Sequence, residues 1–137
     1  MKHTEANLFV DGGSRGNPGP AGVGVVLTTT DNITIAEINV FLGNTTNNAA
    51  EYMSLIHGLQ LAQTHAISRI HIFMDSMLVV KHILGEYKVK NTRLQPLYDR
   101  AQQLLALFGD GYTIEHIERS KNSRADKLAN IAMNRGS

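Results

Sequence analysis

The sequence predicts an α/β protein with one mixed, five-stranded sheet and helices on both faces of that sheet. Three strand-like runs lie close together in the first 41 residues, and helix-like and strand-like runs then alternate to the end of the 137-residue chain. A meander followed by β-α-β units places antiparallel and parallel strands in one sheet. The expected order of elements is βββαβααβα.

The first three strands are expected to form an antiparallel meander. Apolar residues 8–10 predict a short buried strand that ends at Asp11. The glycine- and proline-rich segment 12–20 predicts a turn, and residues 22–27 and 33–41 predict the second and third strands.

The first helix is recognised by a change of period. Leu55 and Leu59 belong to an apolar stripe with helical spacing. Asn48 and Glu51 have the spacing of a capping box, which would place Glu51 in the first turn of this helix.

The later elements follow from apolar runs and from residues that begin or end helices. Residues 70–74 predict the fourth strand, and Ser76 begins a short helix that Gly85 ends. Residues 112–117 predict the fifth strand, and residues 123–134 predict the last helix.

A long helix is expected between these two strands, with Pro96 in its first turn. Its apolar stripe is nearly continuous and predicts a buried face, made of Leu94, Leu97, Tyr98, Ala101, Leu104, Leu105 and Phe108.

Composition limits the classes of function. With 137 residues, the chain is expected to be a single domain, 1–137. It has no cysteine, which excludes disulfides, thiolate zinc sites and cysteine nucleophiles. No secretory signal pattern and no run of about 18 apolar residues is seen, so we expect a cytoplasmic protein without membrane contact.

Charge is unevenly distributed although the net charge is only +1. Residues 1–75 carry three basic and six acidic side chains, and residues 76–137 carry ten basic and six acidic ones. This asymmetry fits either an anionic partner or an ordinary solvated surface, and it does not decide between them.

Four acidic residues, each on a different predicted element, are the main candidates for a site. They are Asp11, Glu51, Asp75 and Asp126. Two of them close apolar strands, where a carboxylate is costly unless it is paired, hydrogen-bonded or bound to a metal. Mg²⁺ prefers oxygen ligands, and neighbouring carboxylates repel each other without a cation. The sequence therefore predicts a Mg²⁺ site.

Each acid also has a structural interpretation of its own. Asp11 could form a turn before Gly12, and Asp75 could cap the helix that follows it. Glu51 and Asp126 could interact with helix dipoles from the first turn. These interpretations do not explain why the acids recur with the neighbours described next.

Four motifs surround these acids. They are Asp11-Gly12-Gly13-Ser14-Arg15-Gly16-Asn17-Pro18-Gly19, Thr45-Thr46-Asn47-Asn48-Ala49-Ala50-Glu51, Asp75-Ser76 and Asn122-Ser123-Arg124-Ala125-Asp126-Lys127-Leu128-Ala129. Each motif alone is weak, whereas the four in this order are highly specific. Over residues 7–134 the chain resembles type 1 ribonuclease H.

The resemblance implies a ribonuclease H-like fold and a particular activity. The protein would be an endoribonuclease that hydrolyses the RNA strand of RNA–DNA hybrids to 5′-phosphate and 3′-hydroxyl ends. Two Mg²⁺ ions would assist each cleavage, with Mn²⁺ as a substitute. Asp11 would bridge the ions, Glu51 and Asp75 would hold one of them, and Asp126 would hold the other. A monomer is expected.

Substrate contacts are expected from the glycine-rich turn and from the start of the first helix. Glycines let the backbone approach a polyanion, and in the family the asparagine positions contact the minor groove, where 2′-hydroxyls identify RNA. The expected contacts are Gly12, Gly13, Asn17, Thr46, Asn47 and Asn48.

The chain departs from many family members at three places. Met77 stands where many have glutamine, and loop 85–93 is too short for a basic protrusion, so the chain resembles the subgroup that lacks it. His116 and Arg119 both precede Asp126, where many members carry a catalytic histidine. On one continuous strand these two would point to opposite faces, so we expect one to assist catalysis, with Arg119 slightly favoured because it remains charged.

Two other classes of function remain open from the sequence. One is another nuclease of the same fold, such as a resolvase, an integrase or an exonuclease. The other is a non-catalytic module that binds hybrid or RNA. Four acids without metal would not help a protein that only binds phosphate, which disfavours the second alternative.

Overall fold

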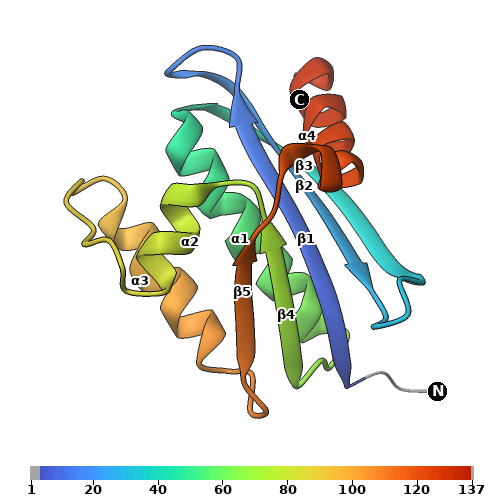
Figure 1. Ribbon diagram of the computed structural model, residues 1–137. Helices are drawn as coiled ribbons and strands as arrows, with labels where there is room; N and C mark the ends of the chain where they lie inside the picture. The colour runs from blue at the N-terminus through green and yellow to red at the C-terminus, as the bar shows by residue number, and fades with distance from the viewer. Residues whose placement is uncertain (1–3, 137) are drawn as a thin grey trace.

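The computed structural model describes residues 4–136, which include one five-stranded sheet with helices on both faces (Figure 1). The strands lie in the order β3-β2-β1-β4-β5. Strands β3, β2 and β1 pair antiparallel, whereas β1, β4 and β5 pair parallel. The expected mixed sheet and the order βββαβααβα are confirmed.

The elements have the following bounds. The strands are β1 (Glu5–Ser14), β2 (Gly19–Thr28), β3 (Thr34–Thr45), β4 (Arg69–Met74) and β5 (Tyr112–His116). The helices are α1 (Asn47–Thr64), α2 (Met77–Ile83), α3 (Gln95–Leu105) and α4 (Ser123–Arg135), with a short 3₁₀ helix, η1 (Arg119–Lys121), before α4.

These bounds correct the expected meander. Strand β1 does not end at Asp11 but continues to Ser14, because the glycine-rich residues after Asp11 pair with β2. Strand β2 begins at Gly19, and β3 runs on to Thr45. The expected turn therefore shrinks to the few residues between β1 and β2.

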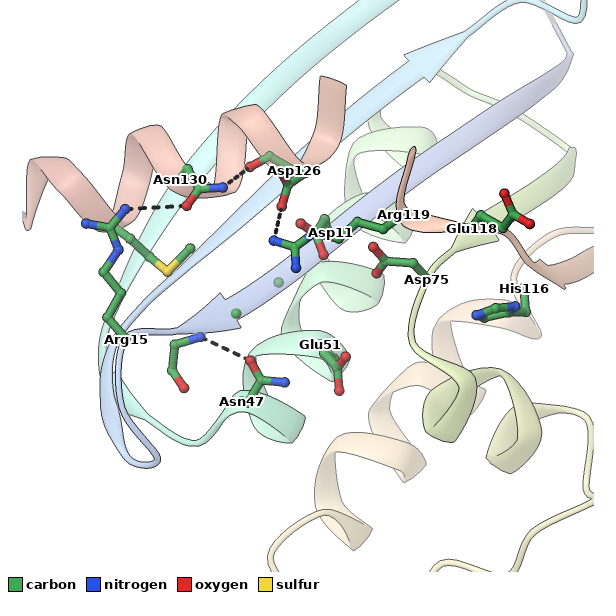
Figure 2. A pocket seen from close by; sticks show the side chains of 14 residues that line it. Asp11, Arg15, Asn47, Glu51, Asp75, His116, Glu118, Arg119, Asp126 and Asn130 are labelled. Atoms are coloured by element: carbon green, nitrogen blue, oxygen red, sulfur yellow. Dashed lines mark hydrogen bonds and ion pairs between the residues drawn. The ribbon is translucent and has the colours of Figure 1, made fainter. Parts of the chain in front are cut away.

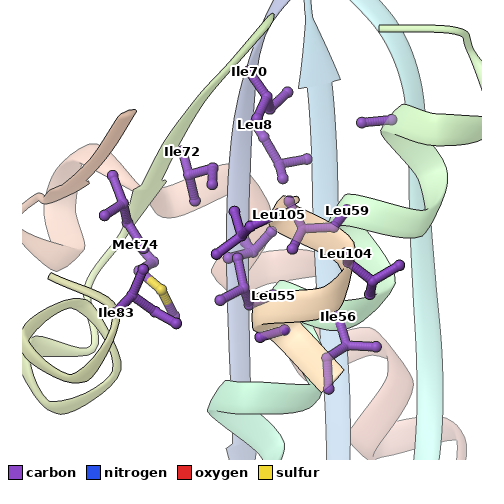
Figure 3. Close-up of a cluster of buried hydrophobic side chains, with 14 of the residues drawn as sticks. Leu8, Leu55, Ile56, Leu59, Ile70, Ile72, Met74, Ile83, Leu104 and Leu105 are labelled. Carbon is purple, nitrogen blue, oxygen red and sulfur yellow. The ribbon is translucent and has the colours of Figure 1, made fainter. Parts of the chain in front are cut away.

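Helices α1, α2 and α3 cover one face of the sheet, and α4 covers the other (Figure 1). Leu8 of β1 and Ile72 of β4 are fully buried against the first group, where Leu55 and Leu59 of α1 are also fully buried (Figure 3). The predicted stripe lies in the same core, where Ala101, Leu104 and Leu105 of α3 are buried. Leu94 and Phe108 are buried too but lie just outside the helix, and Leu97 and Tyr98 are partly buried.

Helix α4 packs directly on the backbone of β2. A Cβ atom at Gly24 would lie 2.0 Å from the carbonyl oxygen of Ala125, so only glycine allows this approach. Ala125 and Leu128 form a small apolar cluster with Val26 on this face. This packing fixes the start of α4 close to the sheet.

Helix α1 begins two residues earlier than the predicted capping box. Thr46 is the N-cap, and its hydroxyl accepts a hydrogen bond from the Ala49 N–H at 3.2 Å. Asn48 is thus inside the helix, and Glu51 lies beyond the first turn, which corrects both expectations. Among residues 4–136, no helix combines the length and apolar character needed to cross a membrane.

Candidate active site

All four predicted acids line one cavity of about 600 Å³ (Figure 2). They come from β1, α1, the segment after β4, and α4. The other residues that line the cavity are Gly12, Gly13, Ser14, Arg15, Asn47, His116, Glu118, Arg119, Asn130 and Met133. Distant parts of the sequence thus form one polar site.

The parallel pairing of β1 and β4 brings Asp11 and Asp75 together. The ladder ends with Val10 opposite Met74, so the two acids follow at the same level on neighbouring chains. Asp75 does not cap α2, because the hydroxyl of Ser76 accepts the N–H of Val79 at 3.3 Å. The capping interpretation of Asp75 is therefore wrong.

Glu51 reaches the cavity from α1, on the opposite side of β1 from α4. Gly12 makes this possible, because a Cβ atom there would lie 2.1 Å from the carbonyl oxygen of Ala50. The Ser76 hydroxyl donates a hydrogen bond to the Glu51 carboxylate. Ser76 therefore both caps α2 and orients Glu51.

Asp126 lies in the first turn of α4, where the helix dipole favours an acid as expected. Its carboxylate also faces the cavity, where Nη2 of Arg119 donates to Oδ1 at 2.9 Å. The dipole interpretation and a role in the site are therefore compatible for this residue.

Burial, together with the nearness of the other carboxylates, raises the pKa values of two of the acids. Burial is the main cause that raises the pKa of Asp11 from 3.8 to about 8, and the nearby charges of Asp75 and Asp126 add to it. Burial and Asp75 raise the pKa of Glu51 to about 7, against the hydrogen bond from Ser76. A cation placed here would relieve this repulsion.

The donor set fits Mg²⁺ as an open site. Among residues 4–136, no three Asp, Glu or His side chains converge tightly enough to enclose an ion by themselves. Mg²⁺ usually keeps several waters and takes only one or two carboxylates, with substrate phosphates completing its coordination. An open ring of carboxylate oxygens is therefore suitable for ions that bind together with a phosphate-containing substrate.

Both His116 and Arg119 line the cavity, and they do not lie on the one continuous strand that would have pointed them to opposite faces. Strand β5 ends at His116, and the chain turns into η1 before Arg119. Figure 2 shows Arg119 among Asp126, Asp11 and Asp75, with His116 farther away beyond Asp75. Arg119 has the position that better suits a charge-stabilising role.

The predicted substrate residues surround the cavity but do not all line it. Asn47 lines it with Gly12 and Gly13. The Asn47 N–H donates to Oδ1 of the exposed Asn17 at 3.1 Å, and Oδ1 of Asn47 accepts from the Ser14 N–H at 3.3 Å. Asn48 lines a second cavity of about 520 Å³ with Lys88 and Lys90.

Five residues that line the cavity are not among the predicted site residues, and two of them, Arg15 and Asn130, are hydrogen-bonded to each other; the five are Ser14, Arg15, Glu118, Asn130 and Met133. Nη2 of Arg15 donates to Oδ1 of Asn130 at 3.4 Å, and Nδ2 of Asn130 donates to the carbonyl oxygen of Asp126 at 2.9 Å. Asp126 and Asn130 are four residues apart on one helix, and this spacing indicates that they lie on the same face. Nothing comparable marked Arg15, because the turn that carries it has no regular period.

Comparisons with known proteins identify the family. The model of a family described as "Reverse transcriptase-like" matches residues 9–132. "Bifunctional protein Rv2228c" of Mycobacterium tuberculosis is 46% identical over 92% of this chain, and "Ribonuclease HI" of Halobacterium salinarum is 42% identical over 93% of it. The chain spans 35% of the first relative's length and 63% of the second's.

A solved structure agrees with both sequence matches. LC11-RNase H1, crystallised in complex with RNA/DNA hybrid, has a TM-score of 0.90 and 37% identity, covering 95% of this chain and 97% of its own. The fold similarity, the sequence identity and the coverage of the two chains therefore support the same assignment. The chain belongs to the ribonuclease HI family, with the ribonuclease H-like fold that its sequence predicts.

Proposed function

We propose that this protein is a divalent-metal-dependent endoribonuclease that cuts the RNA strand of RNA–DNA hybrids. The observation that carries the proposal is the meeting of Asp11, Glu51, Asp75 and Asp126 in one cavity. A module that only binds nucleic acid has no use for four clustered carboxyl groups, since their ionised forms repel phosphate unless a cation is bound. Such acids fit metal-assisted phosphodiester hydrolysis.

The four acids would divide the task of holding two ions. Asp11, the most crowded of them, suits a bridging position, with Glu51 and Asp75 on one ion and Asp126 on the other. Bound Mg²⁺ ions supply an activated water on one side of the phosphate and charge stabilisation of the leaving 3′-oxygen on the other. The products would be 5′-phosphate and 3′-hydroxyl ends. Mn²⁺, with similar oxygen preference, would substitute.

Arg119 would contribute a permanent positive charge to this site. Its guanidinium donates a hydrogen bond to Asp126, and this bond, with smaller contributions from the charges of Asp11 and Asp75, raises the pKa of Arg119. When Asp126 binds an ion, the guanidinium is available to the phosphate, a group whose oxygens match its planar donors. His116 would have a smaller role in the departure of products.

Recognition of RNA would come from the asparagine side chains around the cavity. The amide oxygens of Asn17 and Asn47 accept backbone N–H groups, so each side chain retains its NH₂ group as a donor. Such donors suit 2′-hydroxyls and base edges in the minor groove. Gly12 and Gly13 expose backbone beside them for the RNA strand.

The DNA strand would be held at the second cavity. Asn48 lines it with Lys88 and Lys90, and Thr46 begins the same helix. The Thr46 oxygen accepts the helix N–H, so its hydroxyl hydrogen can point to a phosphate. The relative crystallised with RNA/DNA hybrid supports this class of partner. A monomeric state and a location in the cytoplasm stay predictions.

A labelled hybrid tests the proposed function. The protein is incubated with 5′-labelled RNA annealed to DNA, in Mg²⁺ and then in excess EDTA, and the ends of the fragments are identified. We expect internal RNA cuts with 5′-phosphate ends in Mg²⁺ and none in EDTA. Binding without cutting would favour a non-catalytic module, and cutting of the DNA strand would favour another nuclease of this fold.

A further inference from the structure

We propose that Asn122 is a positioning residue that fixes Asp126 and Arg119 relative to Asp11. This inference rests on the proposed function, because it concerns the same cavity. Asn122 does not line that cavity, and its side chain is almost fully buried between β1 and the start of α4.

Three polar groups of Asn122 connect the parts of the site. Its Nδ2 donates to the carbonyl oxygen of Val10 at 2.8 Å, directly before Asp11. Its backbone N–H donates to the carbonyl oxygen of Arg119 at 2.9 Å. Its own carbonyl oxygen accepts the N–H of Asp126 at 3.0 Å. One residue therefore contacts the backbone beside or at three residues of the cavity.

The side-chain bond is the component that joins the two chain segments. The two backbone bonds of Asn122 lie within the local turn from η1 into α4, whereas the bond to Val10 spans 112 residues of sequence. Without it, packing at Gly24 and the ion pair of Arg124 with Glu37 still hold α4 on the sheet. Gly24 is the cross-strand partner of Asp11 on β2 and Glu37 lies on β3, so neither contact joins α4 directly to the backbone of β1, as the bond from Asn122 to Val10 does.

The amide oxygen of Asn122 also indicates that this position needs a hydrogen-bond donor. Its Oδ1 is buried and has no hydrogen-bond partner among residues 4–136. A buried acceptor without a partner carries a desolvation cost. The fold therefore keeps Asn122 despite the desolvation cost of its Oδ1, and the side chain directs an N–H group at the carbonyl oxygen of Val10.

The proposed role predicts which properties change when the hydrogen bond from Asn122 to Val10 is lost. Metal binding needs the carboxylates of Asp11 and Asp126 to be held within a fraction of an ångström of the productive geometry. Loss of the hydrogen bond from Asn122 to Val10 should thus weaken the affinity for metal ions and lower kcat. It should leave KM for hybrid nearly unchanged, because Asn17, Asn47 and Asn48 lie on other elements.

The test compares Asn122→Ala with a matched control, Thr28→Val. Thr28 is also buried and donates one side-chain bond, to the carbonyl oxygen of Thr29 at 2.8 Å, but it does not line the site cavity. Thermal stability, Mn²⁺ affinity without nucleic acid (by titration calorimetry), kcat and KM are measured for each, well below the melting temperature.

We expect Asn122→Ala to weaken Mn²⁺ binding at least about fivefold and to lower kcat about tenfold or more, with KM within about threefold. Thr28→Val should lower thermal stability but keep Mn²⁺ affinity and kcat within about twofold. If Asn122→Ala does not fold, Asn122→Ser, whose hydroxyl is too short to reach Val10, is judged by the same criteria.

Mn²⁺ affinity and kcat within about twofold of wild type in a destabilised Asn122 variant would show a merely structural residue and overturn the inference. Failure of the wild-type protein to cut hybrid would instead refute the proposed function. The Mn²⁺ titration would still decide the role of Asn122 in that case, so the two failures are distinguishable.

Discussion

The guanidinium of Arg119 donates from Nη2 to Oδ1 of Asp126 at 2.9 Å, and this ion pair places a positive charge within the ring of acids. The Arg119 side chain is 75% exposed, so it can leave Asp126 at little cost. It is therefore the cation best placed to move between a carboxylate and a substrate phosphate.

We predict that Arg119→Ala lowers kcat about ten- to a hundredfold, the result of losing about 1.4–2.7 kcal/mol of charge stabilisation. His116→Ala should cost less than about threefold, because His116 lies beyond Asp75 in the same cavity. Single-turnover cleavage of labelled hybrid measures both. A larger loss of kcat for His116→Ala than for Arg119→Ala would reverse the assignment.

Stability without metal should fall as pH rises. Folding raises the pKa of Asp11 to about 8 and that of Glu51 to about 7, so the folded state prefers their protonated forms. Their contribution to stability is fully present below their unfolded pKa values near ~4 and is lost as pH rises through 7 and 8. Urea unfolding in EDTA at pH 5, 7 and 8.5 measures the fall.

The substitution Asp11→Asn should remove the larger part of the fall in stability with rising pH. At pH 8.5 in EDTA it should be more stable than wild type by at least about 1 kcal/mol, or about 3–5 °C in melting temperature. Asp31→Asn, a change of an exposed acid between β2 and β3, is the matched control and should leave the pH dependence unchanged. Equal pH dependence in wild type and Asp11→Asn would contradict the raised pKa.

Substrate choice should follow the asparagine donors. We predict that hybrid is cut far better than a DNA duplex of the same sequence, and that single-stranded DNA is not cut. Initial rates on the three substrates at one Mg²⁺ concentration provide the comparison. Equal rates on hybrid and DNA duplex would favour a resolvase- or transposase-like enzyme.

Hybrid binding should be weak and should fall sharply with salt. Met77 is exposed but has no donor for the minor groove, and the loop between α2 and α3 offers only a few cations. Lys90→Ala should lower the slope of log affinity against log salt by about 1, since Lys90 lines the second cavity. Arg100→Ala, on α3 outside both cavities, is the control and should not change it.

Sequence patterns were sufficient for the order of the elements and for one mixed sheet, and the four acids that they singled out line one cavity. Apolar runs fixed the existence of each element, and the parallel register of β1 with β4 then brought Asp11 beside Asp75. The sequence patterns did not predict where some helices and strands begin and end. The spacing of Asn48 and Glu51 predicts that Glu51 lies in the first turn of α1, whereas the N-cap is Thr46, two residues before Asn48.

The contacts that orient the acids were not visible in the sequence for a physical reason. The bond from Ser76 to Glu51 and the bond from Asn122 to Val10 join segments 25 and 112 residues apart, and no local period records them. Likewise, the turn at η1 brings Arg119 to the same cavity as His116, which strand alternation alone could not predict.

The most direct test of the central claim replaces one carboxylate of the cavity at nearly constant shape. Asp75→Asn and the control Asp31→Asn are compared with wild type for cleavage of labelled hybrid in Mg²⁺ and for hybrid binding in EDTA. We predict that Asp75→Asn binds hybrid but retains less than about a tenth of wild-type activity, while Asp31→Asn stays within about twofold. An Asp75→Asn protein that binds hybrid and cuts it at more than about a tenth of the wild-type rate would contradict a metal-assisted site built from these four acids.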